Sequence, residues 1–119
     1  VASGATLQLQ GNISVTNEAL SLAGTGVSGN GALRNISGTN TWTGPITLAA
    51  PAEIQTDAGQ LNVSGSITSS NHALTVDGAA NTTLSGALAL GTANVTKTGT
   101  GTLTISGGNS SSGNLNILG

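Results

Sequence analysis

Residues 7–24, LQLQGNISVTNEALSLAG, align without gaps on residues 61–78, LNVSGSITSSNHALTVDG. The two segments share seven identical positions: Leu7/Leu61, Gly11/Gly65, Ile13/Ile67, Asn17/Asn71, Ala19/Ala73, Leu20/Leu74 and Gly24/Gly78. In both segments apolar and polar residues alternate over short runs, and glycines separate the runs. Such alternation predicts short β-strands, and a repeated unit of short strands is typical of a solenoid.

A second match indicates that the chain is duplicated. Residues 36–48, ISGTNTWTGPITL, resemble residues 105–117, ISGGNSSSGNLNI. The first match places Leu7 on Leu61, whereas the second places Ile36 on Ile105, so the second copy is the longer one. We therefore predict a single domain over residues 1–119, made of two sub-repeats (about 1–54 and 55–119) whose equivalent positions stack on one another.

The predicted fold is all-β, a right-handed parallel β-helix (β-solenoid). Strands of three to five residues are too short to be stable in a free hairpin, but stacked in parallel they share one aliphatic core. The alternative is an antiparallel β-sandwich, which usually has longer strands and buried aromatic residues. Trp42 is the only aromatic residue of the chain. The internal repeat favours the solenoid.

The composition argues against several classes of function. The 119 residues include two Lys or Arg, four Asp or Glu and no Cys, so we expect no nucleic-acid partner and no thiol chemistry. No apolar run approaches the roughly 20 residues that span a bilayer, and we expect no membrane insertion within this segment. The chain opens at Val1, which favours a processed chain or a segment of a longer protein.

The few residues with catalytic or metal-binding chemistry do not form a recognisable site. His72, the only His, takes the position of Glu18 in the other segment, which predicts an outward corner. Glu53 and Asp57 are predicted to flank a turn, with no acid–base role. We therefore expect no enzymatic activity, no cofactor and no metal.

Thr-x-Thr pairs raise the question of an ice-binding face. Such pairs begin at Thr41, Thr98 and Thr102. They do not recur at one fixed position of the two sub-repeats, so the sequence does not predict a regular threonine array.

Residues 97–109, KTGTGTLTISGGN, resemble the motif of the autotransporter-associated β-strand repeat, also called the passenger-associated transport repeat. Residues 31–44, GALRNISGTNTWTG, resemble a second copy, with Trp42 where the family often has Tyr or Phe. The copy at 31–44 lacks the leading Lys, and the copy at 97–109 is followed by Ser111 at the aromatic position. The resemblance implies an extracellular or cell-surface β-helical passenger of a bacterium, in which the repeat is a scaffold.

Two functions follow from these observations. The first is a structural rod or fibre segment that stacks head to tail on copies of itself or on adjacent repeats, because neither end carries an evident polar cap. The second is an adhesin-type module that recognises a glycan or a protein through its lateral face. In that case Trp42 is the candidate residue for stacking on a sugar.

Overall fold

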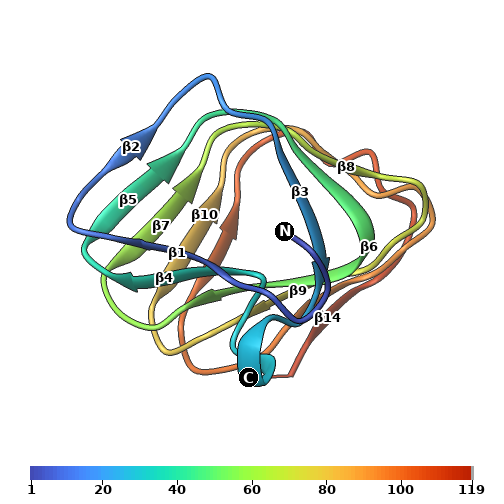
Figure 1. The fold of residues 1–119 in the computed structure, drawn as a ribbon. Coiled ribbons are helices and arrows are strands. Elements are labelled where there is room, and N and C mark those ends of the chain that lie inside the picture. The colour runs from blue at the N-terminus through green and yellow to red at the C-terminus, as the bar shows by residue number, and fades with distance from the viewer. Residues whose placement is uncertain (119) are drawn as a thin grey trace.

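The structure, a computed structural model, describes residues 1–118, and these form a parallel β-solenoid (Figure 1). A five-stranded sheet comprises β2 (Ser14–Val15), β5 (Thr39–Trp42), β7 (Gln60–Val63), β10 (Asn81–Leu84) and β13 (Leu103–Ile105). A nine-stranded sheet comprises β1 (Leu7–Gln10), β3 (Leu20–Gly24), β4 (Leu33–Ser37), β6 (Ile46–Thr56), β8 (Ile67–Ser69), β9 (Leu74–Asp77), β11 (Leu88–Ala89), β12 (Val95–Lys97) and β14 (Leu115–Ile117). The strand pairs are parallel, which confirms the predicted solenoid and excludes the antiparallel sandwich.

Each coil of the solenoid has three faces (Figure 1). The five-stranded sheet is one face, which we call the hydroxyl face after its outward side chains. The short face contains β3, the first part of β6 (Ile46–Leu48), β8 and β11. The charged face contains β1, β4, the second part of β6 (Ala52–Thr56), β9, β12 and β14. The connections are right-handed, as parallel crossovers almost always are.

The register of the hydroxyl face gives the length of a coil. One inward column runs through the paired residues Val15, Trp42, Val63, Leu84 and Ile105. On this face, equivalent residues from Trp42 onward are 21 residues apart, as for the hydrogen-bonded pair Asn81 and Thr102. The first coil is longer because it contains the segment 24–31, which includes the 3₁₀ turn η1 (Val27–Gly29). The shorter coil is therefore the basic unit.

The offset between Leu7 and Leu61 is not the stacking offset. Leu7 pairs with Leu33 on the charged face, whereas Leu61 lies on the hydroxyl face between Asn40 and Thr82. The matched segments therefore occupy coils rotated by one face relative to each other. The physical reason is that strands on every face share the same alternation and glycine spacing, so one segment suits more than one face.

The core is an aliphatic stack enclosed by the three faces. Leu33, Ile54 and Val76 form one inward column on the charged face, and Leu22 and Leu48 belong to another on the short face. All five are at most 3% exposed. Burial of apolar surface in such columns stabilises the folded chain by about 25 cal/mol per Å².

Buried polar side chains satisfy each other at one corner of the core. Asn40 donates from Nδ2 to Asn35 Oδ1 at 2.6 Å and to the Ser37 carbonyl at 2.9 Å. Asn35 in turn donates from Nδ2 to the Ala58 carbonyl at 3.0 Å, and the Ile13 amide donates to Asn40 Oδ1 at 2.8 Å. The corner therefore links neighbouring coils and leaves few buried polar groups unpaired.

Candidate functional site

The C-terminal end of the solenoid exposes its interior. Within the described residues β13 pairs only with β10, and β14 pairs only with β12. Leu115 and Ile117 continue inward columns, yet they are 53% and 65% exposed. An open pocket of about 230 Å³ lies here, lined by Lys97, Leu103, Ile105, Leu115 and Ile117. Free strand edges next to exposed aliphatic side chains favour pairing with another chain.

Lys97 occupies a core position near this end. It pairs with Val76 on one side and with Ile117 on the other, so it continues an aliphatic column. The residue is only 9% exposed, and its Nζ donates a hydrogen bond to the Gly99 carbonyl at 3.0 Å. The aliphatic stem therefore fills the column while the ammonium group reaches the corner of the coil.

The N-terminal end is partly covered by the chain itself (Figure 1). The Val1 ammonium group donates to the Ser21 carbonyl of β3 at 2.6 Å. Ser3 lies close enough to Gly24 that a Cβ there would meet its Oγ at 2.7 Å. The expectation of an uncapped end is therefore wrong for the short face. On the other two faces, β1 and β2 each pair with a single neighbour among the described residues.

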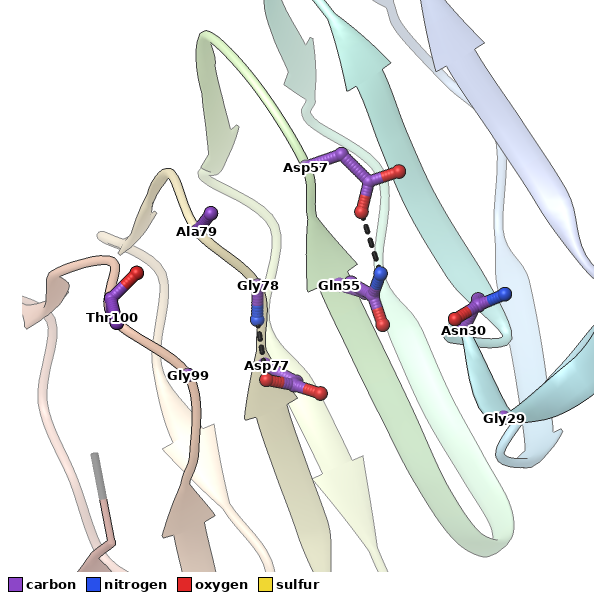
Figure 2. Close-up of a pocket in the computed structure, with 9 residues that line it drawn as sticks. All are labelled: Gly29, Asn30, Gln55, Asp57, Asp77, Gly78, Ala79, Gly99 and Thr100. Atoms are coloured by element: carbon purple, nitrogen blue, oxygen red, sulfur yellow. Dashed lines mark hydrogen bonds between the residues drawn. The ribbon is translucent and has the colours of Figure 1, made fainter.

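A polar groove of about 510 Å³ crosses the outside of the charged face (Figure 2). Asp57 and Asp77 lie along it, with Gln55 and Asn30 beside them. Arg34 Nη2 contacts Asp57 Oδ2 at 2.6 Å, and Gln55 Nε2 donates to Asp57 Oδ1 at 2.5 Å. Because Asp57 is already partnered, the groove offers no open acidic cluster.

Glu53 is the one carboxylate in an unusual environment. Glu53 lies within β6, whereas Asp57 follows the end of that strand. The expectation that the two residues flank a turn is therefore wrong. The side chain of Glu53 is 8% exposed, and Oε1 has no hydrogen-bond partner. Burial, with a further contribution from the negative charge of Asp77, raises the pKa of Glu53 from 4.5 to about 7.

The raised pKa of Glu53 predicts that the chain loses stability as pH rises from 4.5 to about 7. In this window the folded state binds more protons than the unfolded state, so the neutral carboxyl stabilises the fold most below pH 4.5. Glu53→Gln, which keeps the side chain neutral, should remove this loss. After allowance for solvent screening, we expect the variant to be more stable than the native chain at pH 8 by about 1–2 kcal/mol.

Urea denaturation of both proteins at pH 5 and pH 8 measures this effect. The two unfolding midpoints should be similar at pH 5 and should separate at pH 8. Equal midpoints at both values would mean that Glu53 is ionised in the folded chain without cost.

Trp42 lies in the core of the solenoid. It is 5% exposed and stacks between Val15 and Val63 on the inner side of the hydroxyl face. Its indole Nε1 is buried without a hydrogen-bond partner. The ring is therefore not presented to solvent as a sugar-stacking platform, and its large side chain fills the core instead.

His72 and Glu18 lie in different environments. Glu18 is exposed, as expected for an outward corner, whereas His72 is half-buried. The His72 amide donates to Ser69 Oγ at 3.1 Å, and His72 lies with Thr68 and Ser69 beside an open pocket of about 370 Å³ on the short face. No group of three or more His, Cys, Asp or Glu side chains in residues 1–118 could hold a metal ion.

The outward side of the hydroxyl face carries only uncharged polar side chains. Two adjacent outward columns consist of Thr39, Gln60, Asn81 and Thr102, and of Ser14, Thr41, Asn62, Thr83 and Thr104. Thr41, Thr83 and Thr104 share one of these columns, but the Thr-x-Thr pairs that begin at Thr41 and Thr102 do not share one coil position, because Thr41 is equivalent to Thr104.

Comparison with family models, curated proteins and solved structures finds no match for this chain. The resemblance to the autotransporter-associated β-strand repeat therefore stays a prediction. Over residues 1–118 the structure also contains no helix long and apolar enough to cross a membrane.

Proposed function

We propose that the chain is a structural segment of a β-solenoid rod whose ends stack head to tail, on copies of itself or on adjacent repeats of one polypeptide. The observation that carries the proposal is the C-terminal end, where Leu115 and Ile117 belong to inward columns and yet are exposed. A single chain measures 35 × 32 × 28 Å, so an elongated rod requires further coils.

The inward columns of the two ends are complementary. The column that ends at Ile117 begins at Leu7, on the strand that pairs with β4, and the column that ends at Ile105 begins at Val15. A second copy placed with β1 on β14 and β2 on β13 would therefore continue the inward columns with aliphatic contacts. The residues that cover β3 at the N-terminal end lie on the remaining face. A heterologous interface of this kind builds a filament, because it does not close on itself.

The location that fits this function is the bacterial cell surface or the extracellular space. This part of the proposal rests on the resemblance of residues 97–109 and 31–44 to surface passenger repeats. Nothing in the structure supports a stacking role for Trp42 in the adhesin-type alternative, because its ring is buried. The rod is therefore the function that the geometry supports best.

Replacing Ile117 with lysine is expected to prevent head-to-tail association. The substitution places a charge at the end of an aliphatic column, where association would bury it without a partner. Sedimentation velocity over a range of concentrations measures the effect. The native chain should form larger species as its concentration rises, whereas the variant should remain monomeric.

Asn116→Lys is the matched control for this experiment. Asn116 lies on the same strand but pairs with Thr96 in an outward column, so its side chain points away from the interface. This variant should associate like the native chain. A native chain that stays monomeric at high concentration, or two variants that behave alike, would contradict the proposal.

A further inference from the structure

The hydroxyl face forms a two-dimensional array of polar groups. Its strands β5, β7, β10 and β13 are paired in register without a bulge. The strands β5, β7 and β10 each carry two outward positions, Thr39/Thr41, Gln60/Asn62 and Asn81/Thr83. The strand β13 carries Thr104 outward, and Thr102, whose amide donates to Asn81 Oδ1, lies just before it. In a parallel sheet, neighbouring strands lie about 4.8 Å apart and alternate residues about 6.6 Å apart. The polar groups therefore repeat at two fixed distances.

The threonines of this array, and the hydrogen-bonded pair Gln60 and Asn62, have little conformational freedom. Threonine is stiff at χ1 because its Cβ is branched. Gln60 Nε2 donates to Asn62 Oδ1 at 2.7 Å and to Thr83 Oγ1 at 3.1 Å, so the amide-bearing strand is fixed to its neighbour. A ligand that binds here would find the polar groups already in place, which lowers the entropy that binding must offset.

The strands of this array carry no charged side chain, and the exposed Glu18 lies at the corner after β2. Arg34, Glu53, Asp57 and Asp77 belong to the charged face, and Lys97 belongs to an inward column. The hydroxyl face also lacks an outward aromatic ring over the described residues, because Trp42 points into the core. The face therefore suits a neutral, periodic partner that is recognised by hydrogen bonds and shape, and it lacks the platform on which sugars stack.

We propose that the hydroxyl face binds the surface of ice. The spacing between strands is close to a repeat distance between oxygen atoms in hexagonal ice, so successive groups along an outward column can occupy equivalent lattice positions. Head-to-tail stacking involves the ends of the solenoid, so this proposal is independent of it.

The test uses the whole chain and ice itself as the probe. Thermal hysteresis and uptake into a slowly growing ice hemisphere are measured for the native protein and for Thr83→Tyr. The native protein should show both effects. Thr83→Tyr should lose them, because a phenol ring at the centre of the array keeps the flat face away from the lattice.

Thr68→Tyr is the matched control. Thr68 is an exposed outward residue on the short face, paired with Thr47, so the same substitution leaves the hydroxyl face intact. This variant should keep the native activity. Thr104→Lys, on the last strand of the hydroxyl face, gives a second disruption in case Thr83→Tyr does not fold, and circular dichroism establishes folding for each variant.

Three outcomes would overturn the proposal. They are exclusion of the native protein from ice without thermal hysteresis, activity retained in folded Thr83→Tyr and Thr104→Lys, and activity lost equally in Thr68→Tyr. Binding of the native protein to insoluble polysaccharide in place of ice would also overturn it and would assign the face to a glycan.

Discussion

Replacing Gly65 with alanine is expected to destabilise the folded chain by about 2–4 kcal/mol, a large effect for a single methyl group. Gly65 belongs to a column of glycines in which each residue lies directly against the backbone of the preceding coil. A Cβ at Gly65 would overlap the carbonyl oxygen of Gly44, and a Cβ at Gly86 would overlap that of Gly65. The carbonyl is backbone and cannot rotate away, so the two coils must separate.

Separation of the coils at this point also weakens neighbouring hydrogen bonds. The Ser64 amide donates to the Trp42 carbonyl at 2.9 Å, and the Ile67 amide donates to the Ala87 carbonyl at 2.8 Å. Both bonds hold Gly65 between adjacent coils, and a shift there lengthens them. The predicted loss therefore combines steric overlap with disturbed ladder bonds.

Gly108→Ala is the control for this prediction. A Cβ built at Gly108 meets no atom within 4 Å, and its backbone does not have a positive φ. Thermal or urea unfolding followed by circular dichroism should show a lower midpoint for Gly65→Ala and a nearly native midpoint for Gly108→Ala. Equal midpoints for the two variants would mean that coils do not approach each other closely at the glycine column.

The glycine column corresponds to a dipeptide that recurs in the sequence at the coil period. At this corner a hydroxyl residue followed by glycine recurs in successive coils, at Thr43-Gly44, Ser64-Gly65, Ser85-Gly86 and Ser106-Gly107. Thr43 Oγ1 donates to the Val15 carbonyl at 3.0 Å, so the hydroxyl of this pair bonds to the preceding coil. This dipeptide marks one corner of the solenoid only when it is read at the coil period, because it also occurs elsewhere, as at Ser37-Gly38 and Thr98-Gly99.

The fold class was predictable because it depends on local patterns. Alternation in segments such as residues 61–63 and 74–76 marks strands whatever face they occupy. The face and the coil number are less predictable, because all three faces have similar strands. The longer first coil, with its extra segment 24–31, adds to the difficulty, since it displaces the first strands from the period of the later coils.

The candidate sites were less predictable than the fold. Nothing in the local sequence of Trp42 distinguishes an inward position from an outward one until its neighbours Val15 and Val63 are known. Glu53 is an outward residue of a strand, and its burial depends on segments distant in the sequence. The column that contains Thr41, Thr83 and Thr104 can be recognised in the sequence only at the correct coil length, because a wrong period assigns these residues to different positions.

The stacking of each strand on the equivalent strand one coil later is the central claim, and spin-label proximity tests it most directly. The chain contains no Cys, so a double variant such as Asn62→Cys/Thr83→Cys can be labelled at two sites only. Asn62 and Thr83 are outward neighbours on adjacent strands, about 4.8 Å apart. Nitroxides attached there should show strong spin–spin broadening in the electron paramagnetic resonance spectrum.

Gln8→Cys/Asn62→Cys is the decisive comparison. The match of residues 7–24 to residues 61–78 treats these two positions as equivalent, whereas the structure places Gln8 on the charged face and Asn62 on the hydroxyl face. The account predicts broadening for the Asn62/Thr83 pair and a clearly weaker effect for the Gln8/Asn62 pair. An unbroadened spectrum for Asn62/Thr83, or equal broadening for Gln8/Asn62, would contradict it.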